Sequence, residues 1–239
     1  MKITSTSQYK NLFFTYVLSE NNRAFGTIIL LDGLPSNPSS KNNLIKRLSV
    51  QNYDIFFPRY EGTWESTGEF LKRSPSVSIA EFIKALKIGI NIENKKYIAK
   101  KIFILGASFG GGIALDIVDK NIVDKVCAIS PVISFTKVDG INTLEGYLKT
   151  EHEKDYRFNS FNWSRLLNNK IWNLEKGNIK YPNKILIVAG KNDTTVKKRD
   201  VINFSNKNKI EMSLYDFGHI TVGKITEQML KEILGFFSK

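Results

Sequence analysis

The feature that most constrains the fold is the stretch of residues 101–115, which reads KIFILGASFGGGIAL. An apolar, β-branched run meets a serine flanked by glycines and then continues as an apolar segment of helical periodicity. This pattern predicts a buried strand, a sharp turn at Ser108 and a helix. Glycine at positions 106 and 110 fits a turn whose strained backbone leaves no room for Cβ atoms beside the serine.

A serine at such a turn is a candidate nucleophile. Its Oγ projects from the turn, and the first N–H groups of the following helix point toward the space in front of it, where they can stabilise an oxyanion. A serine hydroxyl is a poor nucleophile at neutral pH. It needs a base, usually a histidine that a carboxylate orients.

The chain has two histidines, so the search for a base is short. His219 follows an expected strand in a glycine-containing loop, whereas His152 lies in a charged stretch and is expected to be a solvated side chain. We therefore predict His219 as the base. Asp193 is the candidate acid because it follows the apolar run 185–189. A turn or helix-capping role is the alternative for this aspartate.

The order of elements predicts one α/β domain over residues 1–239, with a mostly parallel, doubly wound sheet. Residues 9–19 are expected to form antiparallel edge strands, followed by a turn at Asn21 and Asn22. Ser78 and Glu81 form a capping-box pattern that predicts the start of a helix.

Two segments interrupt this alternation. Residues 132–181, called the insert below, are interpreted as a cap or lid. Its aromatic residues are expected either to pack it onto the domain or to line an apolar substrate pocket, and both roles are compatible. They are Phe135, Tyr147, Tyr156, Phe158, Phe161, Trp163 and Trp172. The loop of residues 58–70 is expected to be either a packed surface loop or a pocket wall.

Composition and charge indicate which kinds of molecule the protein is not expected to bind. The net charge is +12, but the lysines are spread along the chain without a nucleic-acid recognition motif, so no nucleic-acid partner is expected. No run approaches the roughly 18 apolar residues of a membrane span, and we expect a soluble, cytoplasmic protein with no membrane partner. Cys127 is expected to be a reduced core residue. No metal and no cofactor are expected, because neither a His/Cys cluster nor a phosphate-binding glycine loop is present.

The motif around Ser108 resembles the nucleophile elbow of the α/β-hydrolase family. Residues 189–193 resemble that family's acid loop and residues 217–219 its histidine loop, so the resemblance extends over essentially the whole chain. It implies the α/β-hydrolase fold and a catalytic triad of Ser108, Asp193 and His219. It also implies an oxyanion hole made by the backbone N–H groups of Phe109 and Leu34.

The chain departs from the family pattern at one turn, where Asp32 and Gly33 stand in place of the His-Gly of many members. Residues 59–68 are weakly similar to a segment of single-domain peptidases and acylaminoacyl peptidases, and make Tyr60 and Trp64 candidate substrate-binding residues. The expected function is a serine hydrolase that cleaves carboxylic esters of a small acyl substrate. A hydrolase of small peptides or acyl-amino acids and a non-catalytic binding module are the alternatives.

Overall fold

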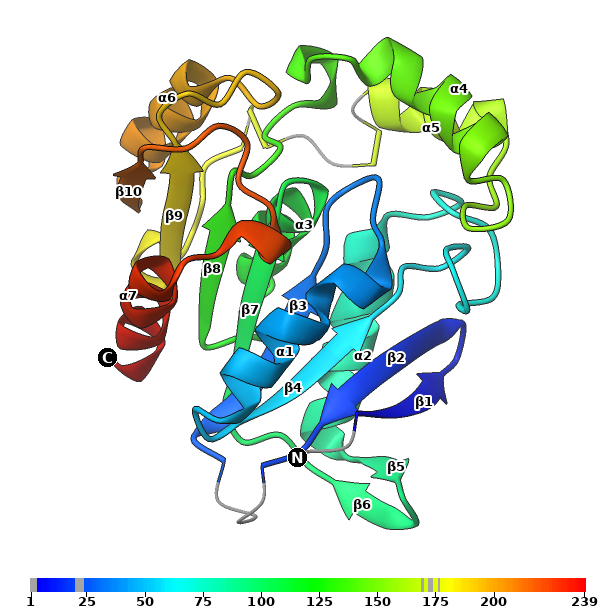
Figure 1. Cartoon of the computed structure of the whole chain (residues 1–239), viewed down its shortest axis with the longest axis vertical. Coiled ribbons are helices and arrows are strands. Elements are labelled where there is room, and N and C mark those ends of the chain that lie inside the picture. The colour runs from blue at the N-terminus through cyan, green and yellow to red at the C-terminus, as the bar shows by residue number, and fades with distance from the viewer. Residues whose placement is uncertain (1–3, 20–23, 169, 172–173, 176) are drawn as a thin grey trace.

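The computed structural model describes residues 4–19, 24–168, 170–171, 174–175 and 177–239 (Figure 1). The turn expected at Asn21 and Asn22, and the side chain of Trp172, lie outside the described residues. The central sheet of the described part has eight strands in the order β1-β2-β4-β3-β7-β8-β9-β10. They are β1 (Ser5–Tyr9), β2 (Leu12–Val17), β3 (Gly26–Leu31), β4 (Tyr53–Pro58), β7 (Ile102–Ala107), β8 (Lys125–Ile129), β9 (Ile185–Gly190) and β10 (Glu211–Tyr215).

Strand β2 pairs antiparallel with both β1 and β4, and the remaining neighbours are parallel. The sheet is therefore mostly parallel, as the sequence predicts, with an antiparallel hairpin at one edge. That hairpin begins at Ser5, earlier than the expected residues 9–19.

Helices cover both faces of the sheet (Figure 1). Helices α1 (Asn42–Ser49) and α7 (Glu227–Ser238) pack on one face. Helices α2 (Pro75–Ile88), α3 (Phe109–Val118) and α6 (Lys198–Asn208) pack on the other. Every residue of β3, β7 and β9 is buried. Their continuous apolar sequences follow from this two-sided burial.

The start of α2 corrects one prediction. Ser74 is the N-cap and Pro75 the first helical residue, so the helix begins before the supposed capping box. Proline suits the first helical position because its fixed φ matches the helix and its missing N–H has no partner to lose. Ser78 is buried inside the helix, and Glu81 pairs instead with Arg73, whose Nη1 lies 2.8 Å from its Oε1. A short hairpin of β5 (Ile90–Ile92) and β6 (Lys95–Tyr97) then precedes β7, and the sequence pattern did not predict it.

The insert lies over the carboxyl end of the parallel strands (Figure 1). It contains η2 (Phe135–Lys137), α4 (Ile141–Glu151) and α5 (Ser160–Leu167), and three other short helical turns are η1 (Pro38–Lys41), η3 (Pro182–Lys184) and η4 (Val222–Lys224). Trp163 and Tyr156 belong to the same hydrophobic core as α2 and α3, whereas Phe161 is 72% exposed. Most of the insert's described aromatic side chains therefore pack it onto the domain.

The loop after β4 is joined to the insert by backbone hydrogen bonds. Trp64 N donates to Asp155 O at 2.7 Å, Arg157 N donates to Gly62 O at 2.8 Å, and Phe70 N donates to Arg157 O at 2.6 Å. The side chain of Phe70 is fully buried in the core. This loop is a packed element that supports the insert.

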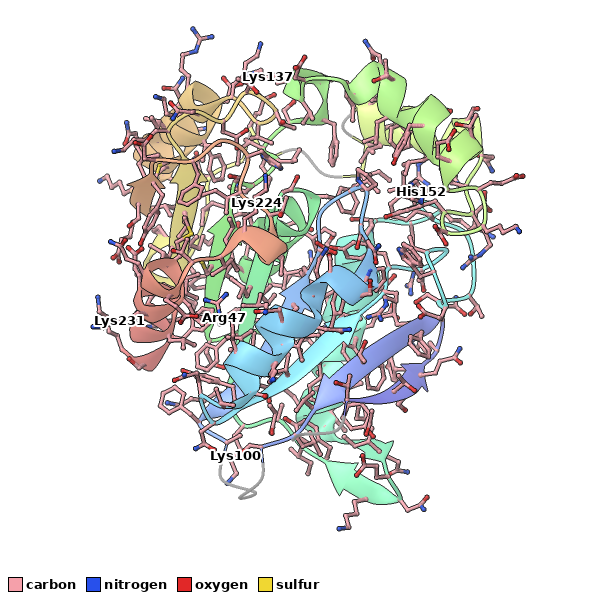
Figure 2. All side chains as sticks on the ribbon, viewed as in Figure 1. Arg47, Lys100, Lys137, His152, Lys224 and Lys231 are labelled. Atoms are coloured by element: carbon pink, nitrogen blue, oxygen red, sulfur yellow. The ribbon has the colours of Figure 1, made fainter. Side chains whose placement is uncertain are left out.

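The remaining sequence expectations concern charge and hydropathy. The labelled cations Lys100, Lys137, Lys224 and Lys231 lie on separate parts of the molecule (Figure 2). None of the described helices is long and apolar enough to cross a membrane. Cys127 is a free thiol in the core, where burial raises its pKa well above the ordinary value.

Candidate active site

The nucleophile elbow has the backbone that the sequence predicts. Ser108 lies between β7 and α3 with φ of 54° and ψ of −115°, and its N–H donates to Ile129 O at 2.8 Å. A Cβ at position 106 would lie 2.3 Å from the carbonyl oxygen of Gly110. A Cβ at position 110 would lie 2.3 Å from the carbonyl oxygen of Leu31. The structure thus confirms the need for both glycines and shows that the second one meets the end of β3.

The predicted base and acid meet at the ends of β9 and β10. His219 Nδ1 lies 2.9 Å from Asp193 Oδ2. The other carboxylate oxygen, Oδ1, accepts from Val196 N at 2.9 Å. Asp193 therefore bonds the histidine with one oxygen and stabilises its own turn with the other. The Asp193 side chain is 1% exposed, and that of His219 is 18% exposed.

Electrostatics keep Asp193 ionised. Burial acts to raise the pKa of its carboxyl, but hydrogen bonds from His219, the Val196 N–H and the Ser130 hydroxyl outweigh burial and lower the pKa below 3.8. An ionised carboxylate can only accept hydrogen bonds, so Nδ1 of His219 carries the proton between them. Nε2 of the neutral imidazole is then the acceptor nitrogen, which is the state that a general base needs.

Two further contacts hold these loops together. A Cβ on Gly190, the last residue of β9, would lie 2.0 Å from Gly218 O, so glycine is required where the two loops touch. Ser130, just after β8, is fully buried, and its Oγ accepts from Ile220 N at 3.3 Å while also bonding the Asp193 carboxylate. The sequence pattern placed Ser130 at a strand end, but nothing in the pattern predicted this bridging role.

Ser108 and His219 line one cavity of about 490 Å³, together with Leu34 and Phe109. Asp193 is not in the lining, because it lies behind the imidazole. The apolar lining residues of the cavity come from the domain and from the insert. Leu34 and Phe109 belong to the domain, and the insert contributes Val132, Phe135, Val138, Ile141 and Leu144. The polar lining residues include Asn37, Ser40, Lys41, Asp139, Thr195 and Thr221.

The two expected oxyanion donors are both at this cavity. Phe109 is the first residue of α3, immediately after Ser108, and it lines the cavity. Leu34 follows Gly33, whose Cβ position would be 3.3 Å from Ser108 Cβ. The loop after β3 thus lies directly against Ser108.

Asp32 occupies the place of the histidine found in many family members. Its carboxylate accepts from Gly33 N at 2.8 Å and lies 2.6 Å from Lys41 Nζ. The side chains of this ion pair are only 6% and 7% exposed. Lys41 was not a predicted site residue, because its position before a helix gives no sign that the ammonium group is buried.

The candidate substrate-binding residues Tyr60 and Trp64 are not among the residues that line the cavity. Tyr60 is buried, its hydroxyl donates to Asp32 O at 2.7 Å, and its ring lies 5.3 Å from that of Phe109. It supports the cavity from beneath. Trp64 belongs to the loop that is joined to the insert.

His152 lies in the insert, at the carboxyl end of α4 (Figure 2). Its side chain is 25% exposed, and its ring nitrogens lie 2.9 Å from Asp155 Oδ2 and 3.1 Å from Tyr147 Oη. His152 is thus a partly exposed side chain whose ring nitrogens contact other residues of the insert. Nothing in this geometry links His152 to Ser108.

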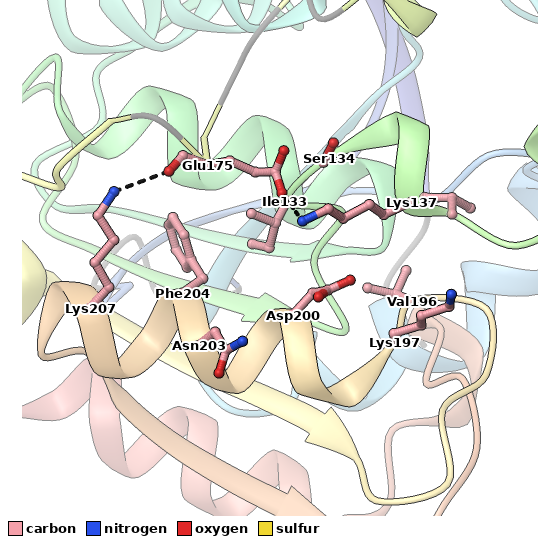
Figure 3. Close-up of a pocket in the computed structure, with 11 residues that line it drawn as sticks. Ile133, Ser134, Lys137, Glu175, Val196, Lys197, Asp200, Asn203, Phe204 and Lys207 are labelled. Carbon is pink, nitrogen blue, oxygen red and sulfur yellow. Dashed lines mark hydrogen bonds and ion pairs between the residues drawn. The ribbon is translucent and has the colours of Figure 1, made fainter.

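A second cavity of about 150 Å³ lies between the insert and α6 (Figure 3). Glu175 forms an ion pair with Lys137 there, and its carbonyl oxygen accepts from Lys207 Nζ at 3.0 Å. Val196, three residues after the acid, is in its wall, but no triad residue lines it. Among the described residues, no group of three or more His, Cys, Asp or Glu side chains is placed to hold a metal ion.

Comparison with solved structures identifies the fold. An esterase of Pyrococcus furiosus superposes with a TM-score of 0.72 at 19% identity, covering 99% of this chain and 92% of the other. An α/β hydrolase from the metagenome of lagoon sediments at Mar Chica, Morocco, gives 0.69 at 17% identity over 98% of both chains. The chain has the α/β-hydrolase fold. A third structure, an α/β hydrolase from a Penicillium species, gives 0.71 at 16% identity over 99% of this chain and 98% of the other.

The likeness is visible in structure but not in sequence comparison. No protein-family model matches the sequence, and no curated protein matches it. In the α/β-hydrolase fold described here, strands β3, β7, β8, β9 and β10 all end at the edge of the sheet where Asp32, Ser108, Ser130, Asp193 and His219 follow them.

Proposed function

We propose that this protein is a serine hydrolase that cleaves carboxylic esters through an acyl-enzyme on Ser108. One observation carries the proposal. His219 is held at 2.9 Å by a buried, ionised Asp193 and lines the same cavity as Ser108. A carboxylate that fixes the tautomer of an imidazole beside a serine is the arrangement that makes the hydroxyl a nucleophile.

The reaction proceeds in two halves. Ser108 Oγ attacks the ester carbonyl while Nε2 of His219 takes the hydroxyl proton, and the N–H groups of Leu34 and Phe109 bind the oxyanion. The intermediate collapses, and His219 returns the proton to the departing alcohol. Water then attacks the acyl-enzyme by the same route, with His219 as the base, and releases the acid and free Ser108.

The cavity favours an ester with an apolar acyl group. Its volume of about 490 Å³ is typical of sites for small molecules. Phe135, Ile141 and Leu144 of the insert give it an apolar wall. In this proposal residues 132–181 serve as a cap that shields the acyl group from water, within a single domain of residues 1–239.

The test is intact-mass detection of a covalent adduct after treatment with a fluorophosphonate. We expect one adduct on the native chain, none on Ser108→Ala, and an unchanged adduct on the control Ser205→Ala, which removes a buried hydroxyl that bonds Ile210 O. Loss of the nucleophile should reduce kcat on short acyl esters by about 10⁶-fold with the melting temperature unchanged. An adduct that persists on Ser108→Ala would overturn the assignment.

A substrate comparison then separates ester from amide hydrolysis. Acyl esters of nitrophenol and aminoacyl amides of nitroaniline, whose released chromophores are both read by absorbance, should differ in kcat/KM, with the esters faster. Faster cleavage of the amides would replace this proposal with a peptidase. If the folded native chain is not labelled and hydrolyses neither series, the remaining alternative is a non-catalytic binding module.

A further inference from the structure

The loop of residues 32–41, called the first loop below, is closed by a buried ion pair. Asp32 follows the last residue of β3, and Lys41 ends η1 immediately before α1. Lys41 Nζ lies 2.6 Å from Asp32 Oδ2, and both side chains are more than nine-tenths buried. The pair therefore joins the two ends of the loop that carries Leu34, the expected second oxyanion donor.

Both charged groups are already occupied by the protein. An ammonium group has three donors, and those of Lys41 reach Asp32 Oδ2, Ser40 Oγ at 2.7 Å and Asn37 O at 3.3 Å. The Asp32 carboxylate accepts from Lys41, from Gly33 N and from the hydroxyl of Ser36. Although both residues line the cavity, Lys41 has no donor left for a substrate. Their contacts hold the loop rather than a ligand.

The same loop is also held from below and from the insert. Tyr60 donates its hydroxyl to Asp32 O at 2.7 Å, and the hydroxyl of Tyr156 accepts from Ser36 N at 2.7 Å. These contacts fix the segment that presses Gly33 against Ser108. An oxyanion donor must lie about 3 Å from the developing charge, so a shift of the loop by an ångström removes most of its effect.

We propose that the Asp32–Lys41 ion pair positions the first loop so that Leu34 N–H is aligned with the oxyanion formed at Ser108. This inference rests on the proposed hydrolase function. Asp32 and Lys41 are positioning residues, since they act through the loop and do not touch the reacting atoms. Asp32 thereby takes over, by a different contact, the turn position that is histidine in many family members.

The test uses three variants: Asp32→Asn, Lys41→Met and the two combined. They distinguish the cost of an unpaired buried charge from the effect of a displaced first loop on kcat. Each single change leaves one buried charge without its partner, so melting temperature and kcat should both fall. The double variant removes both charges together, and its melting temperature should recover toward that of the native chain. Its kcat should stay about 10- to 100-fold below native, with KM within about twofold, because the loop is no longer held.

Three readouts decide the outcome: kcat and KM on a short acyl ester, the rate of fluorophosphonate labelling of Ser108, and the melting temperature. The control is Lys120→Met, which breaks the half-exposed pair with Asp116 on the surface of α3 and should leave all three unchanged. A double variant with native kcat would overturn the positioning role and leave only a structural pair.

Two variants that leave the charge unchanged test the proposal even if the charge variants fail to fold. Ser36→Ala and Tyr60→Phe each remove one hydroxyl contact to Asp32 without changing charge, and each should lower kcat several-fold at constant KM. Native kcat in both would also overturn it. Failure of the proposed function is distinct, because the native chain itself would then show no labelling and no turnover.

Discussion

Two buried aspartates at the carboxyl edge of the sheet each hold a basic side chain, and the two pairs differ in what they leave available. Asp193 bonds one ring nitrogen of His219, and the other nitrogen remains for proton transfer at the cavity. Asp32 bonds Lys41, whose three donors are all taken up by protein oxygens. In the proposals made above, the same carboxylate chemistry serves catalysis at one pair and loop geometry at the other. The two pairs differ in whether the basic side chain keeps a hydrogen-bonding atom that no protein group occupies.

The largest loss of kcat, and so the clearest difference between the two pairs, is expected from Asp193→Asn. The amide cannot hold the imidazole in the correct tautomer, so kcat should fall by about 10⁴-fold, far more than for Asp32→Asn. Steady-state kinetics on a short acyl ester measure both. Asp216→Asn is the matched control, since this exposed carboxylate accepts from Asn192 Nδ2 at 3.0 Å and should leave kcat unchanged. Equal losses in the Asp193 and Asp32 variants would break the distinction.

A smaller effect is expected from Ser130→Ala. The change removes a hydrogen bond to the Asp193 carboxylate and the acceptor of Ile220 N. Hydrogen bonds to charged groups contribute about 1.5–3 kcal/mol, so kcat should fall about tenfold with KM nearly unchanged. Kinetics and melting temperature together test this, with Ser205→Ala as the control for loss of a buried hydroxyl. A fall in melting temperature without a fall in kcat would limit Ser130 to stability.

The smallest effect concerns pH and stability. The folded pKa of Asp193 is lowered from 3.8, so the unfolded chain binds more protons at this site as the solution becomes acidic. The stabilisation is fully present above the unfolded pKa and is lost as the pH falls through the folded pKa. The free energies of urea unfolding of the native chain and of Asp193→Asn should therefore differ at about pH 7 and begin to converge only as the pH falls below about 4. A constant difference across this range would contradict the shift.

Much of the site could be predicted because each of its parts carries a local signal. The glycines around Ser108 mark a turn with no room for side chains, and Asp193 and His219 each follow a strand. The boundary of α2 was misplaced because a capping-box pattern at Ser78 competed with a proline at position 75, and the proline set the start. The contact between Asp193 and His219 and the cavity that His219 shares with Ser108 support the site prediction, and labelling of Ser108 is its test.

The roles of longer-range contacts could not be predicted. Tyr60 was a candidate substrate-binding residue in a loop expected to be either packed on the surface or a pocket wall, and its hydroxyl donates to Asp32 O. Ser36 and Tyr156, which share a hydrogen bond between the first loop and the insert, are 120 positions apart. No periodicity or motif encodes such a pair, because it depends on how the insert settles on the sheet.

The sequence by itself determined the alternation of buried strands and helices, the elbow at Ser108 and the loops that carry Asp193 and His219. These follow from local rules: apolar periodicity sets the elements, and parallel strands bring their carboxyl ends to one edge. Only the tertiary structure decided that Lys41 is buried against Asp32, that Ser130 bridges the acid and histidine loops, and that the insert supplies the apolar wall. Burial and pairing of polar groups depend on residues far apart in the chain, which meet only once the sheet and the insert are packed.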